Sequence, residues 1–421
     1  MTYAYSIPHL LLVLAALLAT AKLLGALAQR FGQPAVLGEL IAGVLLGGSV
    51  FGLLDPTDPV IYALSELGVI VLLFEIGLHT DLRQMGKVAG TATTVGLVGV
   101  TIPFVLGYVA ASSVLGLERI PALVCAAALT ATSIGISARV LSDIGQLNSR
   151  EGQVVLGAAV LDDIVGLIVL SVVTSIAVGG SWTVSGIVRT TVIAVGFIAV
   201  ALSVGRFLAR PIFSSIKTIR APGTLAAVAL AFAFLLSSLA ASSGSAMILG
   251  AFAAGIILNT TAERAEIERA TTTIGHLLVP IFFASVGAAV ELPAFRESKT
   301  LAAAGLLILV GVIGKFVAAY APWWFRGNKP LIGVAMIPRG EVGLIFAQMG
   351  LATQAISPSL FSALALMVLA TTFMAPPILA RLGGNGTGRG TVRDDVGIDD
   401  LVAGDWGQRT PRSPSDPGSS E

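Results

Sequence analysis

Residues 158–170 read AAVLDDIVGLIVL and place two adjacent aspartates, Asp162 and Asp163, inside an apolar run. Such a run is typical of a helix that spans a membrane. An ionised aspartate without a partner costs about 2.5–3.5 kcal/mol at the centre of a membrane helix, so the two together would cost roughly 5–7 kcal/mol. We therefore expect both aspartates to face partners inside the protein and to serve a function.

The composition predicts a helical membrane protein with many spans. Hydrophobic residues make up 55% of the 421 residues and charged residues only 12%, and the mean hydropathy is +0.91. A soluble chain of this length would need far more charge to cover its surface. We expect a lipid bilayer around the protein and no nucleic-acid partner, because a formal net charge of +1 gives no sign of one.

Charged or turn-rich breaks divide the chain into thirteen apolar segments. The first is interpreted as a span and not as a signal peptide, because no basic region precedes it and no A-x-A cleavage site stands out. The predicted spans are 7–28, 34–50, 59–78, 88–113, 120–141, 152–178, 184–205, 222–240, 244–259, 272–290, 300–321, 331–350 and 358–380.

Basic residues indicate the orientation of these spans. Thirteen lysines and arginines fall in the predicted loops of one side, and three fall on the other side, namely Arg119, Arg296 and Lys299. Because basic loops tend to stay in the cytoplasm, we expect the N-terminus outside and the C-terminus inside.

An odd number of spans allows two halves of opposite orientation, spans 1–6 and 8–13, joined by span 7. Transporters built from such inverted repeats often form their site from interrupted helices in matching positions of the two halves. The fifth helix of each half contains such a stretch: TATSIG at 130–135, and IPRGEVG at 337–343, where Pro338 removes an amide donor. We therefore predict two broken helices.

Several polar residues are expected at one depth of the membrane. Asp162 and Asp163 lie about ten residues into their span, which is roughly 15 Å at 1.5 Å per residue. Lys315 lies eight or nine residues before Trp323 and Trp324, which are typical of an interfacial aromatic belt. The other candidates at this depth are Thr130, Thr132, Ser133, Arg339 and Glu341.

The two aspartates are expected to have different partners, because adjacent residues of a helix point about 100° apart. One aspartate would pair with Lys315, and the other would face a water-filled cavity. A carboxylate there, with hydroxyl and freed carbonyl oxygens nearby, can bind either a proton or a small cation, so competition for it produces exchange. Two structural alternatives stay open: an Asp162–Lys315 bridge between helices, and mutual neutralisation of Arg339 and Glu341.

Most of these candidates lie in short motifs that are specific as a set: VLDDIVG, TATSIGISARVL, LGELIAGVLLG (37–47), LLFEIGLHTDL (72–82), PIFFASVG (280–287), GKF and MIPRGEVGLI (336–345). Over approximately residues 8–380 the chain resembles the second branch of the monovalent cation:proton antiporter superfamily, which includes bacterial sodium/proton antiporters and Kef-type potassium systems. The resemblance implies an all-α fold of thirteen transmembrane helices with inverted repeats and two crossed broken helices. It also implies a homodimer in the bacterial inner membrane.

The resemblance further implies roles for the candidate residues. Asp163 would be the principal carboxylate for cation and proton, with Thr132 as a further ligand of the transported Na⁺, and Asp162 would be the partner of Lys315. Transport would proceed by elevator-like alternating access and serve pH homeostasis, with no cofactor and no enzymatic activity. The crossing of the broken helices would be lined by Thr130, Thr132 and Ser133.

The resemblance also implies a division into a dimerisation domain and a mobile ion-transporting core. The expected parts are 1–82 (dimerisation domain, first part), 83–180 (core, first half), 181–221 (linker helix), 222–297 (dimerisation domain, second part), 298–381 (core, second half) and 382–421 (disordered cytoplasmic tail). In the dimerisation domain, Glu39 and Glu75 are predicted to make buried helix contacts, with a side path for ions as the alternative. His79 is predicted to be solvated, with pH sensing as the alternative.

The leading functional hypothesis is the exchange of Na⁺ or Li⁺ for H⁺, because members with two adjacent acids resemble electrogenic sodium/proton exchangers. The nearest alternative is K⁺/H⁺ exchange, although potassium-type members often carry a glutamine before a single aspartate. A solute:sodium symporter fits Lys315 and the paired acids less well. An intramembrane aspartyl protease is a remote alternative, because its acids lie on different helices and no GxGD sequence occurs here.

Overall fold

The computed structural model describes residues 6–80, 82–177, 184–216, 223–243, 246–289 and 297–384. The predicted disordered tail lies outside the described residues, except that 382–384 continue the last helix. Within the described residues the regular structure is helical, apart from one isolated bridge between Gly47 and Leu54. The described part of the chain therefore has the predicted all-α class.

The helices follow the order of the predicted spans. They are α1 (Ile7–Arg30), α2 (Ala35–Leu46), α3 (Pro59–His79), α4 (Leu82–Val109) with the π-helical turn η1 (Ala110–Val114), α5 (Arg119–Ala128), α6 (Ile134–Asp143), α7 (Arg150–Ala177), α8 (Val184–Ile216), α9 (Thr224–Ser242), α10 (Met247–Asn259), α11 (Arg264–Ala288), α12 (Ser298–Ala318), α13 (Lys329–Ala335), α14 (Glu341–Ala352) and α15 (Pro358–Gly384).

Eight stretches of the described helices are long and apolar enough to cross a membrane. They lie in α1, α3, α4 with η1, α7, α9, α11, α12 and α15. Shorter apolar helices, among them α2, α5, α10 and much of α14, occupy the other predicted spans. Length and composition thus support a multi-pass membrane protein, while the number of thirteen crossings stays a prediction.

Several helices are longer than the apolar segments that predicted them. α4 begins at Leu82 and not at residue 88, and α8 continues to Ile216 and not to 205. α11 begins at Arg264, eight residues before the predicted start at 272. Hydropathy marks only the part of a helix that lies in hydrocarbon, whereas backbone hydrogen bonding continues into the polar interface.

The fifth and the twelfth predicted spans are each divided into two short helices. Residues 129–133 separate α5 from α6, and residues 336–340 separate α13 from α14. Pro338 lies in the second gap, where its ring and its missing N–H oppose a continuous helix. Gly340 follows in an extended conformation with φ −122° and ψ −151° and ends the gap.

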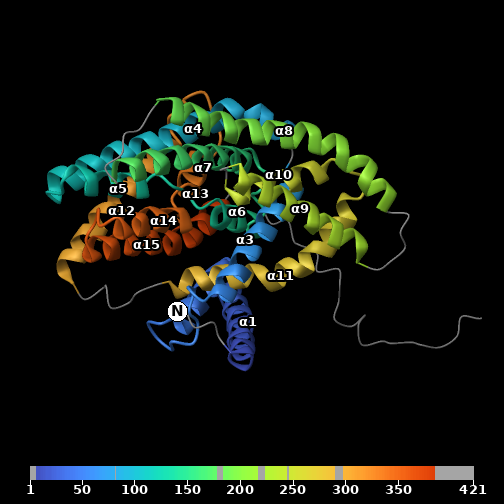
Figure 1. Ribbon diagram of the computed structural model, residues 1–421, viewed down its shortest axis with the longest axis horizontal. Coiled ribbons are helices and arrows are strands. Elements are labelled where there is room, and N and C mark those ends of the chain that lie inside the picture. The colour runs from blue at the N-terminus through green and yellow to red at the C-terminus, as the bar shows by residue number, and fades with distance from the viewer. Residues whose placement is uncertain are drawn as a thin grey trace, which may run out of the picture. The chain divides into compact units, whose positions relative to one another are not determined.

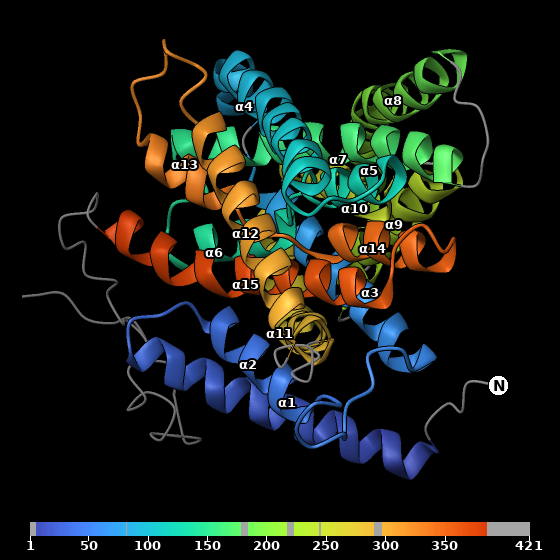
Figure 2. The same ribbon diagram turned by 90° about the vertical axis from the view of Figure 1, so that its left-hand side faces the viewer.

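The helices pack in two recognisable groups. In one group α3 packs against α10 and α11, and α2 packs against α1 and α11; Figure 2 shows α1 and α2 running side by side. In the other group α4 packs against α7 and α12, and α15 packs against α12 and α14, with α14 and α15 adjacent in Figure 1. The backbones of α2 and α11 approach each other closely, because a Cβ atom at Gly43 would overlap the carbonyl oxygen of Ala284, and one at Gly287 that of Leu40.

We expect Gly287→Ala to destabilise the protein by about 1–3 kcal/mol, because the added methyl group forces α2 and α11 apart. The measurement is the melting temperature in detergent. Gly86→Ala on α4 is the matched control, since a Cβ atom at Gly86 meets nothing within 4 Å. An equal melting temperature for the two variants would contradict the close approach of the two helices.

Candidate functional site

The centre of the site is a buried ion pair between α7 and α12. The Lys315 ammonium group donates to both carboxylate oxygens of Asp162, at 2.9 and 3.1 Å. The two side chains are 0% and 1% exposed. Away from water such a pair is stable only if its geometry is good, and removing either partner leaves an uncompensated charge.

Asp163 points into a different environment, as expected for the next residue of the helix. It borders a small cavity that leaves about 10 Å³ for the centre of a water-sized sphere, which is about enough for one water molecule. The residue as a whole is 8% exposed. The cavity is lined by Val69, Thr132, Ser133, Ile134, Gly135, Asp163, Ile248, Phe282, Gly340 and Val342.

The two helix breaks are joined to each other at this cavity. The backbone N–H of Ser133 donates to the carbonyl of Pro338 at 2.8 Å, and the Thr132 hydroxyl donates to the carbonyl of Met336 at 3.3 Å. Gly340 packs directly on Ser133, because a Cβ atom there would lie 2.7 Å from the Ser133 Oγ atom. Each break thus supplies polar groups for the other, and both contribute to the wall beside Asp163.

Arg339 is fully buried, and its hydrogen bonds connect the second break with the first break and with α12. Its guanidinium group donates to the carbonyl of Ala131 at 2.8 Å and to that of Gly311 at 3.1 Å, while its own carbonyl accepts from the Thr372 hydroxyl. The backbone of Glu341 begins α14, but its side chain lies outside the described residues. The expected Arg339–Glu341 contact is therefore not part of what the structure describes.

Thr130 differs from the expectation that it lines the site. It is fully buried, but its hydroxyl donates to the carbonyl of Ala127 at 2.7 Å, and it is not among the residues that line the cavity. A threonine hydroxyl often turns back to its own helix in this way. Ser137 was not among the predicted site residues. Its hydroxyl, on α6, donates to the carbonyl of Ala335 on α13.

The charges of the site are nearly balanced. Lys315 and Arg339 bring two buried positive charges, and Asp162 and Asp163 bring two carboxylates. Asp163 acts electrostatically on Lys315 besides the direct bond of Lys315 to Asp162. Among the described residues no cluster of three His, Cys, Asp or Glu side chains could hold a metal ion.

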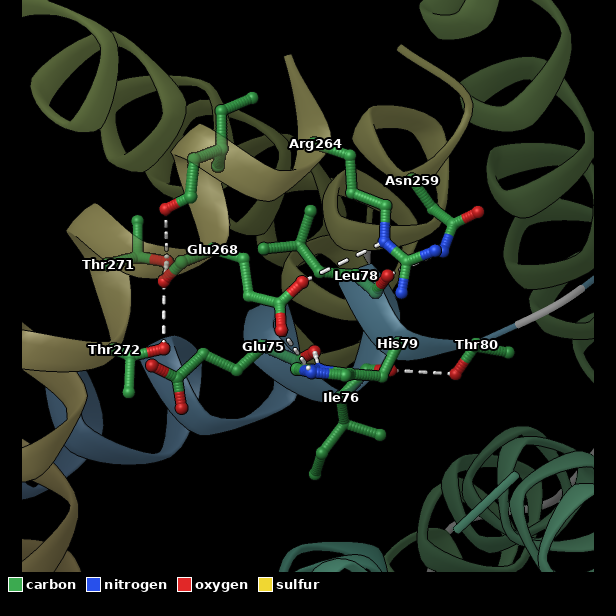
Figure 3. Close-up of polar contacts among 11 residues, drawn as sticks. Glu75, Ile76, Leu78, His79, Thr80, Asn259, Arg264, Glu268, Thr271 and Thr272 are labelled. Atoms are coloured by element: carbon green, nitrogen blue, oxygen red, sulfur yellow. Dashed lines mark hydrogen bonds and ion pairs between the residues drawn. The ribbon is translucent and has the colours of Figure 1, made fainter. Parts of the chain in front are cut away.

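His79 lies at the end of α3 and makes more contacts than a solvated residue would. Its Nε2 atom lies 2.8 Å from Glu268 of α11, and its Nδ1 atom lies 2.8 Å from the carbonyl of Glu75. Figure 3 shows this contact beside Arg264, which lies 3.9 Å from Glu268. The side chain of His79 is 35% exposed, so it is partly solvated as predicted, and it also has a partner that lies 189 residues away in the sequence.

Comparison with known proteins identifies the family. The model of the sodium/hydrogen exchanger transmembrane family matches residues 13–383. The chain belongs to the sodium/hydrogen exchanger family. The high-affinity Na⁺/H⁺ antiporter NhaS3 of Synechocystis is 40% identical over 88% of each chain. The Na⁺/H⁺-K⁺ antiporter GerN of Bacillus cereus is 33% identical over 87% of this chain and 94% of that protein.

A solved structure shows the same fold. The sodium proton antiporter MjNhaP1 of Methanocaldococcus jannaschii matches with a TM-score of 0.64 over 90% of this chain and 98% of that one, at 17% sequence identity. Together with the family, this likeness establishes the helical membrane antiporter fold. This exchanger is therefore a cation/proton transporter and not an enzyme, so the alternative of an intramembrane protease is excluded.

We expect Lys315→Gln to destabilise this exchanger by about 3–5 kcal/mol, because Asp162 would stay buried without its counter-charge. The double variant Asp162→Asn/Lys315→Gln is expected to recover most of that loss. The melting temperatures of the two single variants and the double variant in detergent form the test. If the stability losses of the two single variants simply added up in the double variant, a direct pairing of Asp162 with Lys315 would be contradicted.

Proposed function

We propose that this protein exchanges Na⁺, or Li⁺, for H⁺ across the membrane by alternating access. Asp163 is the carboxylate for which cation and proton compete. The cation is further held by the Thr132 hydroxyl, with Ser133 beside it. Asp162 is the partner of Lys315, and the two joined breaks form the crossing of broken helices.

One observation carries this proposal: Asp163 borders a cavity between the two breaks while the adjacent Asp162 is engaged by Lys315. Asp163 therefore brings a second carboxylate to the cavity, next to the one that Lys315 binds. A proton neutralises its charge with a bond to one oxygen, and a small cation neutralises it with several oxygen ligands. Both cannot occupy the same carboxylate and small cavity at once, so uptake of one requires release of the other.

Movement of the loaded site completes the cycle. A bare carboxylate resists transfer through the low-dielectric part of the protein, whereas its neutralised form does not. We propose that the core (83–180 and 298–381) moves against the dimerisation domain (1–82 and 222–297), with 181–221 as the linker, in a homodimer of elevator type. The distribution of basic residues supports an external N-terminus and a cytoplasmic C-terminus in a bacterial inner membrane.

Na⁺ is proposed as the cation because the names of NhaS3 and GerN both include Na⁺/H⁺ exchange. The name of GerN also includes K⁺, which makes K⁺ the rival to test. Lys315 is proposed as a second group that takes up or releases a proton during the cycle. More than one proton per cation then makes the exchange electrogenic.

Asp163→Asn is expected to abolish exchange, since a neutral amide binds neither the proton nor the cation. The assay is cation-driven pH change in proteoliposomes, with Na⁺, Li⁺ and K⁺ compared. The control is Glu66→Gln on α3. It also replaces a carboxylate with an amide, but Glu66 does not line the cavity. Robust exchange by Asp163→Asn would refute the role of Asp163, and a clear preference for K⁺ in the unmodified protein would refute the choice of Na⁺.

Lys315→Gln is expected to lower the voltage dependence of whatever exchange it retains, because a position that titrates with the transported proton is lost. Exchange is measured at imposed membrane potentials, set with valinomycin and a gradient of a cation that the protein does not transport. An unaltered voltage dependence would contradict the proposed electrogenic role of Lys315.

A further inference from the structure

A hollow of about 690 Å³ lies between the segment that follows α2, the end of α11, and helices α14 and α15. It is far larger than the cavity beside Asp163, which has room for about one water molecule. Its lining includes four polar side chains, those of Ser49, Asp55, Thr57 and Gln348. The carboxylate of Asp55 gives this lining a negative charge, which attracts cations from solution. The hollow is therefore suited to the entry of a cation.

Helix α11 connects the hollow with the cavity. Phe282 lines the cavity, and Ala288 and Ala289 line the hollow. Ala288 follows Phe282 by six residues, which is about 9 Å at 1.5 Å per residue. Residues three or four apart lie on the same face of a helix. Phe282, Ser285 and Ala288 therefore form one stripe that runs from the cavity to the hollow.

Helix α14 makes the same connection. Gly340, which directly precedes it, lines the cavity, and Leu344 and Gln348 line the hollow. These three positions follow one another at intervals of four residues, so they also share one face. The step from Gly340 to Leu344 is about 6 Å. The cavity and the hollow are thus neighbours along two helices, and less than two helical turns separate them.

The side chains between the cavity and the hollow are mainly apolar. Phe282 is only 4% exposed, and its ring lies near α6, since a Cβ atom at Gly135 would meet it at 3.7 Å. On α14 the next side chain of the shared face is that of Leu344. A hydrated cation loses water in such an apolar passage, and oxygen atoms of the protein must replace that water. A route to Asp163 therefore needs a polar group within this wall.

Ser285 is such a group. It is 6% exposed, and its hydroxyl has no hydrogen-bond partner among the described residues. A hydroxyl inside a helix often donates to the carbonyl four residues earlier, as Thr371 does to Met367 at 2.8 Å. A buried hydroxyl without a partner is costly. Ser285 is not among the lining residues of the cavity or of the hollow, so it lies in the wall between them.

We propose that Ser285 is a temporary ligand of the cation on its way between the hollow and Asp163. Its hydroxyl oxygen replaces one water molecule of the hydration shell while the cation crosses the apolar wall. This role rests on the proposed function and deepens it, because it assigns the cation a route along α11 and α14. In the proposed orientation the segment between α2 and α3 is external, so this route leads to the outside.

Ser285→Ala removes the hydroxyl group and adds no volume. Entry of the cation from the hollow is then expected to slow, so that the half-saturating Na⁺ concentration on that face rises about 3–10-fold, the scale of one hydrogen bond. The constant on the opposite face is not expected to rise, because the ligands around Asp163 are unchanged. The measurement uses proteoliposomes of one orientation, with Na⁺ varied on one side at a time.

Ser237→Ala on α9 is the matched control. Ser237 is likewise buried, with 2% exposed, and its hydroxyl has no hydrogen-bond partner among the described residues. It belongs to neither lining, so both constants are expected to stay unchanged. A purely structural effect of Ser285→Ala would lower the melting temperature or the maximal rate without raising the constant on one face alone.

A second measurement does not depend on transport. With the buried Cys125 replaced by alanine, the variants Gln348→Cys, Ser285→Cys and Ser237→Cys each carry a single thiol. The probe is Ag⁺, a thiol-reactive monovalent cation, added to one face in chloride-free buffer, and the remaining thiols are counted with a maleimide after denaturation. We expect Ser285→Cys to react from the same face as Gln348→Cys and about 10-fold faster than Ser237→Cys, because a thiol without a route reacts only through rare openings.

Two results would overturn the role of Ser285: a reaction of Ser285→Cys with Ag⁺ that is no faster than that of Ser237→Cys, or constants that stay unchanged on both faces in Ser285→Ala. If the unmodified protein exchanged no cation at all, the proposed function would fail. The reaction with Ag⁺ would still show whether Ser285 lies on a route that a monovalent cation can follow from the hollow.

Discussion

The buried pair of Lys315 and Asp162 is the interaction on which the rest of the site depends. Both side chains are almost completely removed from water, so neither charge is tolerable there without the other. The pair fixes α12 against α7 and engages one of the two adjacent acids. The neighbouring Asp163, turned by the pitch of the helix, is left to border the cavity.

The two interrupted helices bring backbone N–H and C=O groups into an apolar interior. A helix that stops inside the protein leaves N–H and C=O groups without partners. Here the breaks bond to each other through Ser133 and Pro338, and Arg339 satisfies the carbonyl of Ala131. Polar atoms are thus brought beside Asp163, and the named groups at the two breaks have hydrogen-bond partners.

Much of this could be predicted from the sequence because it depends on local pattern. The length of apolar runs predicted the order of the helices, and Pro338 with its glycines predicted one interruption. The helix ends were misplaced because hydrogen bonding continues beyond the hydrocarbon layer. Thr130 was expected at the cavity, yet its hydroxyl turns back to its own helix, a choice of rotamer that no spacing rule reveals.

The sequence by itself determined that the chain is an α-helical membrane protein with costly acids in its interior, because hydropathy and the price of a buried charge are properties of the residues. The tertiary structure decided which acid pairs with Lys315, which hydroxyls reach the cavity, and that His79 meets a carboxylate on another helix. Such partners come from distant parts of the chain, and only the packing of the helices brings them within hydrogen-bonding or electrostatic range.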